Sequence, residues 1–223
     1  MGFHIHRNEI ITSGYLTALY FKECQRTQPW PQFAARVPHI FVVGGDGIPA
    51  EFNAVGVRAT LTRSIVDTRK PDFVIAGIDR TMTYAKIARA QRAIMTEGAL
   101  FIATNQDPTF PVEDGFQPGA GTIVAAISTA AGKPPDIVVG KPHALAMQIT
   151  LEAAQCKPSE VIMVGDRLDT DIQVGRQAGV FSVLVLSGVT TRARLKAVKN
   201  PMQKPDYVLK DVNGLRRFLL NGV

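Results

Sequence analysis

The 223-residue sequence is 46% hydrophobic and 20% charged, which is the composition of a folded globular protein. It has no apolar run of the roughly 18 residues that a membrane helix needs, which excludes an integral membrane protein, and its first residues lack the pattern of a secretory leader. Cys24 and Cys156 lie far apart and show no CxxC spacing, so we expect reduced thiols in a cytoplasmic protein.

The net charge of +6 and the pI near 9.5 raise the question of a nucleic-acid partner. Lys and Arg are scattered along the chain, and no basic run is longer than Arg216-Arg217. We therefore expect neither a nucleic-acid nor a membrane partner. A mild positive field also suits an anionic small substrate such as a phosphate ester.

Apolar runs typical of buried strands alternate with helix-like stretches, which predicts an α/β protein with mainly parallel strands. A helix is expected over residues 9–24, and a polar, proline-rich connector follows it. Residues 39–132 then form three strand–helix repeats, with strands at HIFVV, DFVIAGIDR and ALFIATN. Thr83 is a candidate cap for the helix that Gly98 ends. DPTFPVEDGFQPGAG is expected to be a loop, and TIVAAISTAAG a helix.

The last third of the chain repeats this alternation. Strands are expected at DIVVG, EVIMVG, FSVLVL and DYVL, with helices at HALAMQITLEAAQ, from Asp171 to Ala178, and at VNGLRRFLL. The sequence therefore indicates two α/β units that are joined near residues 133–136.

Two of these strands end in residues that suit phosphoryl transfer. Lys141 follows DIVVG directly, and Asp166 follows EVIMVG. Ligands of parallel sheets bind beyond the carboxyl ends of the strands. A lysine there offsets the charge of a phosphoryl group, and a carboxylate binds Mg²⁺. Either signal alone is also typical of a solvated turn residue or a helix cap.

The acids that follow Asp166 are expected to differ in role. Asp171 lies at a predicted helix start, where it can hold Asp166 or Lys141 in place by hydrogen bonding. Thr170 and Asp171 are also candidate caps of that helix. Asp169 is expected to be solvated and to take no part in the site.

GKP at 140–142 and VGDRLDTDI at 164–172 together resemble the third and fourth signature motifs of the haloacid dehalogenase (HAD) superfamily. The resemblance is closest to its NagD-like branch (subfamily IIA) of p-nitrophenyl, phosphoglycolate and pyridoxal phosphatases. Nearly the whole chain takes part. VIAGIDRTMTYAKIARAQRAI, ALFIATNQD and PGAGTIVAAI resemble the cap domain of that branch, NEIITSGYLTALYFKE the core helix before it, and LVLSGVTTRARL the stretch after motif four.

The resemblance implies a Rossmann-like HAD core, N-terminally truncated, with an inserted α/β C2-type cap. Residues 1–30 would be a remnant of the core, 31–135 the cap, and 136–223 the C-terminal part of the core. It implies a Mg²⁺-dependent phosphatase that hydrolyses small phosphate monoesters through an aspartyl-phosphate. Caps of this branch often mediate homodimers, so a homodimer through the cap is also implied.

By the same resemblance, Lys141 matches the catalytic lysine, Asp166 the metal ligand and Asp171 the second acid of motif four. Asn105 and Asp107 would lie in the cap near the substrate entrance; the alternative is that they only cap the turn before Pro108.

The sequence contains no Asp-x-Asp-Gly, the family motif whose first aspartate becomes phosphorylated. Its only Asp-x-Asp is Asp169 to Asp171, already placed in motif four. We therefore expect a truncated chain without its nucleophile, and whether it is an enzyme is left open. The alternative is a non-catalytic phosphate- or metal-binding module, or one half of a split enzyme.

Overall fold

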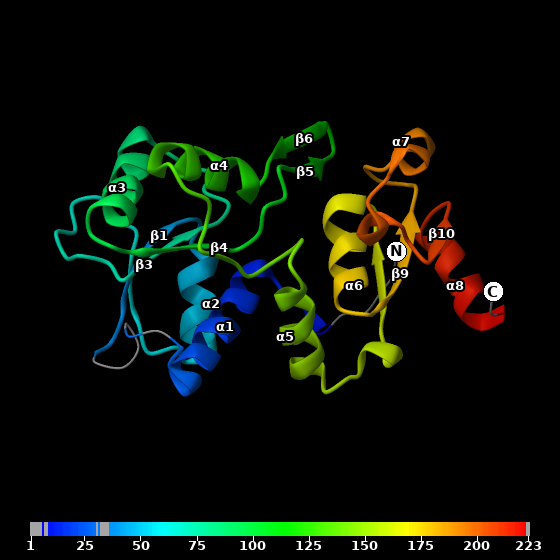
Figure 1. Cartoon of the computed structure of the whole chain (residues 1–223), viewed down its shortest axis with the longest axis horizontal. Helices are drawn as coiled ribbons and strands as arrows, with labels where there is room; N and C mark the ends of the chain where they lie inside the picture. The colour runs from blue at the N-terminus through cyan, green and yellow to red at the C-terminus, as the bar shows by residue number, and fades with distance from the viewer. Residues whose placement is uncertain (1–5, 7–8, 30, 32–35, 222–223) are drawn as a thin grey trace. The chain divides into compact units, whose positions relative to one another are not determined.

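The structure is a computed structural model that describes residues 6, 9–29, 31 and 36–221 (Figure 1). The contacts within the chain divide it into two compact units, Met1–Gly140 and Lys141–Val223. None of the helices in the described part of the chain is long and apolar enough to cross a membrane.

The first unit is built on a parallel five-stranded sheet. The strand order is β2-β1-β3-β4-β7, and every neighbouring pair is parallel. The strands are β1 (His39–Val43), β2 (Thr60–Thr62), β3 (Phe73–Ala76), β4 (Leu100–Ala103) and β7 (Ile137–Val138). All residues of β1 and β3 are buried, as the continuous apolar runs predict for strands covered on both faces.

Helices cover both faces of this sheet: α1 (Ser13–Thr27), α2 (Gly47–Val55), α3 (Tyr84–Met95) and α4 (Ala120–Ala131) (Figure 1). On one face, Phe21 of α1 lies 5.0 Å from Phe73 of β3 and 5.2 Å from Phe52 of α2, measured between ring centroids. On the other, alternate residues of the strands pack with α3 and α4 in one buried cluster. The period-two alternation of a strand thus serves two helical layers.

The predicted helix signals hold locally. The side chain of Thr83 accepts a hydrogen bond from the N–H of Lys86 and caps α3, as expected. Gly132 ends α4 with a φ of 65°, a left-handed conformation that glycine adopts without strain. The predicted helix over residues 9–24 begins and ends three residues later, with Thr12 as its cap.

One prediction for this unit is wrong. Residues 107–121 were expected to be a loop, but they contain an antiparallel hairpin of β5 (Thr109–Val112) and β6 (Gly115–Pro118). Pro111 and Pro118 suggested a loop because proline cannot donate a ladder hydrogen bond. In a two-stranded sheet both strands are edges, so each proline can face away from its partner.

The second unit carries a three-stranded parallel sheet in the order β10-β9-β8. Its strands are β8 (Ile162–Gly165), β9 (Phe181–Val185) and β10 (Tyr207–Leu209). Its helical segments are α5 (Ala144–Ala154), the 3₁₀ turn η3 (Pro158–Glu160), the π-helical turn η4 (Leu168–Ile172), α6 (Gln173–Gln177), α7 (Arg192–Ala197), the 3₁₀ turn η5 (Pro201–Gln203) and α8 (Val212–Asn221).

The core of the second unit forms where η4 meets the sheet. Leu168 and Ile172 of η4 pack on Leu184 of β9, and Leu195 and Val198 around α7 pack against this cluster. Both ends of the acidic motif are therefore fixed by buried leucine and isoleucine side chains.

The strand β7 pairs with β4, so residues 137 and 138 belong to the sheet of the first unit. The predicted junction lay a few residues earlier, near 133–136. The division into a core remnant (1–30), a cap (31–135) and a C-terminal core (136–223) stays a prediction.

Candidate functional site

Asp171 organises the loop that follows β8. One of its carboxylate oxygens, Oδ2, accepts hydrogen bonds from the backbone N–H groups of Asp166 at 3.2 Å and Arg167 at 3.1 Å. The Asp171 side chain is 7% exposed, so these bonds replace its hydration. A β-carbon at Gly165 would lie 2.2 Å from that of Asp171, so this close approach requires glycine. The loop from 166 to 171 is thereby folded back onto its own start.

Lys141 binds the other oxygen of the same carboxylate. Its Nζ lies 2.7 Å from Oδ1 of Asp171, within hydrogen-bond distance. The lysine side chain is 37% exposed, which leaves its ammonium accessible to solvent. Asp171 therefore contacts both Lys141 and the Asp166 backbone, which is the contact that the sequence led us to expect. The catalytic role of these residues remains a prediction.

Asp166 is held from a second strand end. Its Oδ2 accepts the N–H of Val189 at 2.7 Å, and its backbone carbonyl accepts the N–H of Thr190 at 3.1 Å. Gly188 makes this possible, since a β-carbon there would lie 2.1 Å from Oδ2 of Asp166. Within the described residues, Oδ1 of Asp166 makes no hydrogen bond. The turn after β9 thus fixes the carboxylate and leaves one oxygen for a ligand.

Two expectations for the neighbouring residues are wrong. Asp169 is not simply solvated: its Oδ2 lies 3.1 Å from Nη2 of Arg194, and its Oδ1 is buried. Thr170 and Asp171 do not cap a helix start, because a π-helical turn already begins at Leu168. Asp171 bonds to the preceding loop, and Thr170 is buried. π-Helical turns occur frequently at functional sites.

Asn105 and Asp107 lie in the first unit and have local partners. Oδ1 of Asn105 accepts the N–H of Asp107 at 3.1 Å, and its Nδ2 donates to Oγ of Ser13 at 3.1 Å. The carbonyl of Asp107 accepts the N–H of Gly121 at 2.9 Å. This geometry is that of an Asx turn, the turn-capping alternative. A role near a substrate entrance stays a prediction.

The donor atoms at the end of β8 fit a hard divalent cation in part. The described residues contain no group of three or more His, Cys, Asp or Glu side chains that could hold a metal ion. Mg²⁺ retains several waters and commonly binds one or two carboxylates plus substrate phosphate oxygens. The available oxygen of Asp166 matches this requirement, and no complete protein cage is needed.

The turn after β9 supplies contacts that the sequence did not single out. The N–H groups of Val189 and Thr190 position Asp166, yet every residue except proline has such a donor. The only available signal was Ser187-Gly188, a turn pair directly after a strand. Sequence reasoning therefore found the carboxylate and missed its support.

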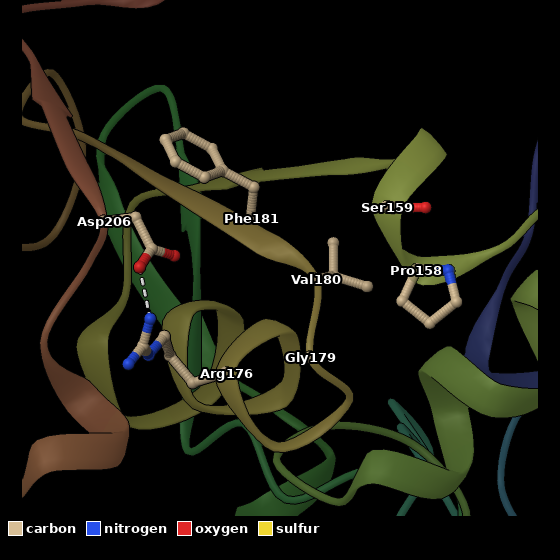
Figure 2. Close-up of a pocket in the computed structure, with 7 residues that line it drawn as sticks. All are labelled: Pro158, Ser159, Arg176, Gly179, Val180, Phe181 and Asp206. Atoms are coloured by element: carbon tan, nitrogen blue, oxygen red, sulfur yellow. Dashed lines mark hydrogen bonds and ion pairs between the residues drawn. The ribbon is translucent and has the colours of Figure 1, made fainter.

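A pocket of about 480 Å³ lies at the opposite, amino end of the β8–β9 pair (Figure 2). Asp206 in this pocket pairs with Arg176 and also accepts the N–H and hydroxyl of Ser182, both at 2.8 Å. The remaining lining residues are Pro158, Ser159, Gly179, Val180 and Phe181. Its one carboxylate is thus engaged in holding the fold, and the pocket lacks the lysine and acids of the other edge.

Comparisons with known proteins assign the family. A family model described as HAD-hydrolase-like matches residues 138–215. The acid sugar phosphatase of Staphylococcus haemolyticus is 35% identical over 205 residues, which cover 92% of this chain and 70% of that protein. The chain belongs to the haloacid dehalogenase superfamily.

Solved structures of HAD phosphatases share its fold. The p-nitrophenyl phosphatase from Archaeoglobus fulgidus matches 97% of this chain and 77% of its own, with a TM-score of 0.76 and 31% identity. The glycerol phosphate phosphatase from Mycobacterium tuberculosis in complex with magnesium matches 96% and 60%, with a TM-score of 0.79 and 32% identity. The predicted α/β fold, a Rossmann-like HAD core plus cap of the NagD-like branch, is confirmed.

Proposed function

We propose that this chain provides the lysine and metal-binding part of a phosphatase site that hydrolyses small phosphate monoesters. The observation that carries the proposal is the two-sided contact of Asp171, which binds Lys141 through one oxygen and the Asp166 loop through the other. The phosphatase names of its relatives support the reaction class. The substrate itself depends on the cap and is left open.

In this proposal, Lys141 neutralises part of the charge on the phosphoryl group. Its ammonium carries three N–H donors on a flexible stem, and Asp171 fixes the position of one of them. Donors and charges that are already oriented need no reorganisation during the reaction, so they stabilise the transition state strongly. Asp171 thus acts through Lys141 as a positioning residue.

We further propose that Asp166 binds Mg²⁺ through the oxygen that Val189 does not occupy. A bound Mg²⁺ would neutralise phosphate oxygens in the transition state. The hydrogen bond from Val189 fixes the direction of the carboxylate, so the ligand oxygen is oriented before a metal arrives.

An aspartyl-phosphate requires a carboxylate that attacks phosphorus while the ester oxygen leaves as an alcohol, after which water cleaves the acyl phosphate. The motif that provides this carboxylate in HAD enzymes, Asp-x-Asp-Gly, is absent from these 223 residues. This absence favours the second candidate function, a phosphate- and metal-binding module that becomes catalytic only with a nucleophile from another polypeptide.

Hydrolysis of p-nitrophenyl phosphate in Mg²⁺ tests the proposal. If the chain is active, Lys141→Ala should lower turnover about 100-fold, because it removes an oriented charge from the transition state. Lys133→Ala is the matched control, since Lys133 also forms a 2.6 Å ion pair with an aspartate, Asp136. Equal turnover in the Lys141 and Lys133 variants would contradict the assigned role.

Calorimetry with Mg²⁺ and inorganic phosphate separates the two candidate functions. Binding that Lys141→Ala weakens, with no turnover in the unaltered chain, would favour the non-catalytic module. If the unaltered chain binds neither ligand, both candidate functions are wrong. Light scattering addresses the homodimer expected through residues 31–135, and a monomer would remove that prediction.

A further inference from the structure

The positive charge of the chain is concentrated near its C-terminus. Residues 190–217 contain eight Lys and Arg and two Asp, so their formal charge of +6 equals that of the whole chain. Within this stretch, residues 192–204 contain five basic and no acidic residues. We call residues 192–204 the basic segment. It contains no basic run, so a search for runs misses it.

Most of these charges are exposed and lack an acidic partner. Arg194 pairs with Asp169, as described above. The other four basic residues are exposed, and no carboxylate among the described residues lies within the 4.0 Å of an ion pair. They are Arg192, Lys196, Lys199 and Lys204. The surface therefore carries four charges that only solvent ions or a partner can neutralise.

The fold keeps these charges on the outside of the second unit. The segment begins with α7, capped by Thr191 (Figure 1). Leu195 of α7 and Val198 directly after it pack against the buried cluster of Leu168, Ile172 and Leu184. Arg192 and Lys196 are one helical turn apart, so they share a face about 6 Å apart along the axis. The segment is therefore a fixed array of cations anchored by its apolar side chains.

This arrangement discriminates between anionic partners. A helix that lies in a lipid surface needs an apolar face to bury there, but Leu195 and Val198 are already packed against the protein. A small phosphate ester requires one or two cations, whereas this segment offers four along a line. A polymer with a regularly repeated phosphate matches that layout.

We propose that the basic segment is a binding surface for the phosphodiester backbone of a nucleic acid. The proposal departs from the expectation drawn above, because that expectation depended on the absence of a basic run. Contacts of this kind are electrostatic and independent of base sequence, so binding should fall steeply as salt rises.

Fluorescence anisotropy with a short labelled single-stranded oligonucleotide and the full chain tests this proposal. Four phosphate contacts predict a slope of about −3 for log K against log salt between about 50 and 200 mM. Neutralising Arg192, Lys196, Lys199 and Lys204 to Gln should weaken binding at least about tenfold and flatten the slope. Gln is a good helix former, so α7 should persist, which circular dichroism checks.

The matched control removes the same charge elsewhere, by changing the exposed residues Lys70, Lys210, Arg216 and Arg217 to Gln. It should bind nearly as tightly as the unaltered chain. Equal losses in the two variants would show a response to net charge alone and overturn the proposal. Binding to vesicles containing phosphatidylserine but not to the oligonucleotide would also overturn it, as would the absence of any binding. Arg192→Lys, which retains the charge, should retain the affinity.

Discussion

Two glycines determine how closely the residues of the acidic loop can approach. Gly165 lies against the side chain of Asp171, and Gly188 lies against the carboxylate of Asp166. In each case a β-carbon would come within 2.2 Å of a side-chain atom, so any larger residue must displace an acid. The carboxylates are thus positioned as much by missing side chains as by hydrogen bonds.

Gly188→Ala should impair the site by displacing Asp166. The added methyl would overlap Oδ2 and break its bond to the N–H of Val189, so we expect Mg²⁺ affinity to fall about tenfold or more, as for lost metal-site support. Stability should decrease by about 1–3 kcal/mol, as is typical of overpacking. Calorimetry with Mg²⁺ and urea unfolding measure the two effects.

Gly47→Ala is the control for that substitution, because a β-carbon at Gly47 meets no atom within 4 Å. It should leave Mg²⁺ binding unchanged. If Gly188→Ala binds Mg²⁺ as well as Gly47→Ala does, Asp166 is not the ligand.

At this scale, the sequence predicted the residues whose chemistry is distinctive. Lys141, Asp166 and Asp171 could be found because lysine and aspartate are uncommon directly after buried strands. The support from Val189 and the buried oxygen of Asp169 could not be found. Both depend on how the turn after β9 and the helix α7 approach the loop, which is a consequence of tertiary packing.

Between elements, a buried ion pair joins the loop after β3 to the first turn of α3. Nζ of Lys86 lies 2.8 Å from Oδ2 of Asp79, and Thr81 donates its N–H and hydroxyl to Oδ1, both at 2.8 Å. The side chains of Asp79 and Lys86 are 1% and 13% exposed. Burial alone would raise the pKa of the Asp79 carboxyl, but the bonds from Lys86 and Thr81 outweigh it and hold that pKa below its ordinary value.

This pair predicts a loss of stability in acid. Since the pKa of Asp79 is lowered by folding, its contribution is complete above the unfolded value of about 3.9 and disappears as the pH falls through the folded value. Asp79→Asn should cost about 3 kcal/mol at neutral pH, because it leaves the Lys86 ammonium without its charge partner. The difference between the two proteins should shrink below about pH 4, measured by urea unfolding.

Glu23→Gln is the comparison for Asp79→Asn, since Glu23 forms an exposed pair with Arg26. Exposed pairs contribute little, so no measurable change is expected. A cost for Asp79→Asn that stays constant from neutral to acidic pH would show that the charge of Asp79 is not what stabilises this loop.

The elements that the sequence predicted well are those with a strong local pattern. β1, β3 and β4 were visible as apolar runs, and α3 by its cap and periodicity. The hairpin β5–β6 was not predicted, because its prolines outweighed the turn at Glu113-Asp114. The π-helical turn η4 also has no local signature, because it forms where Asp171 bonds back to the loop.

For the whole molecule, the sequence predicted two α/β units and a parallel arrangement, and misplaced one strand. Residues 137–138 form β7, which joins β4 of the first sheet and not the strands that follow. Alternating strands and helices are visible locally, whereas the partner of a strand depends on residues far away in the sequence. The concentration of charge after residue 190 was likewise missed because no single run of residues contains it.

The division into Met1–Gly140 and Lys141–Val223 predicts that each unit opens on its own. Phe21→Ala removes a fully buried ring from the first core, and we expect a cost of about 3–5 kcal/mol. Hydrogen exchange measured by mass spectrometry should then accelerate in β1, β3 and β4, and much less in β8 and β9. Leu184→Ala, in the buried cluster of the second unit, should produce the opposite pattern. Equal acceleration across all five strands in both variants would mean that the chain unfolds as one cooperative body, so that damage in the first core also loosens the Asp166 loop.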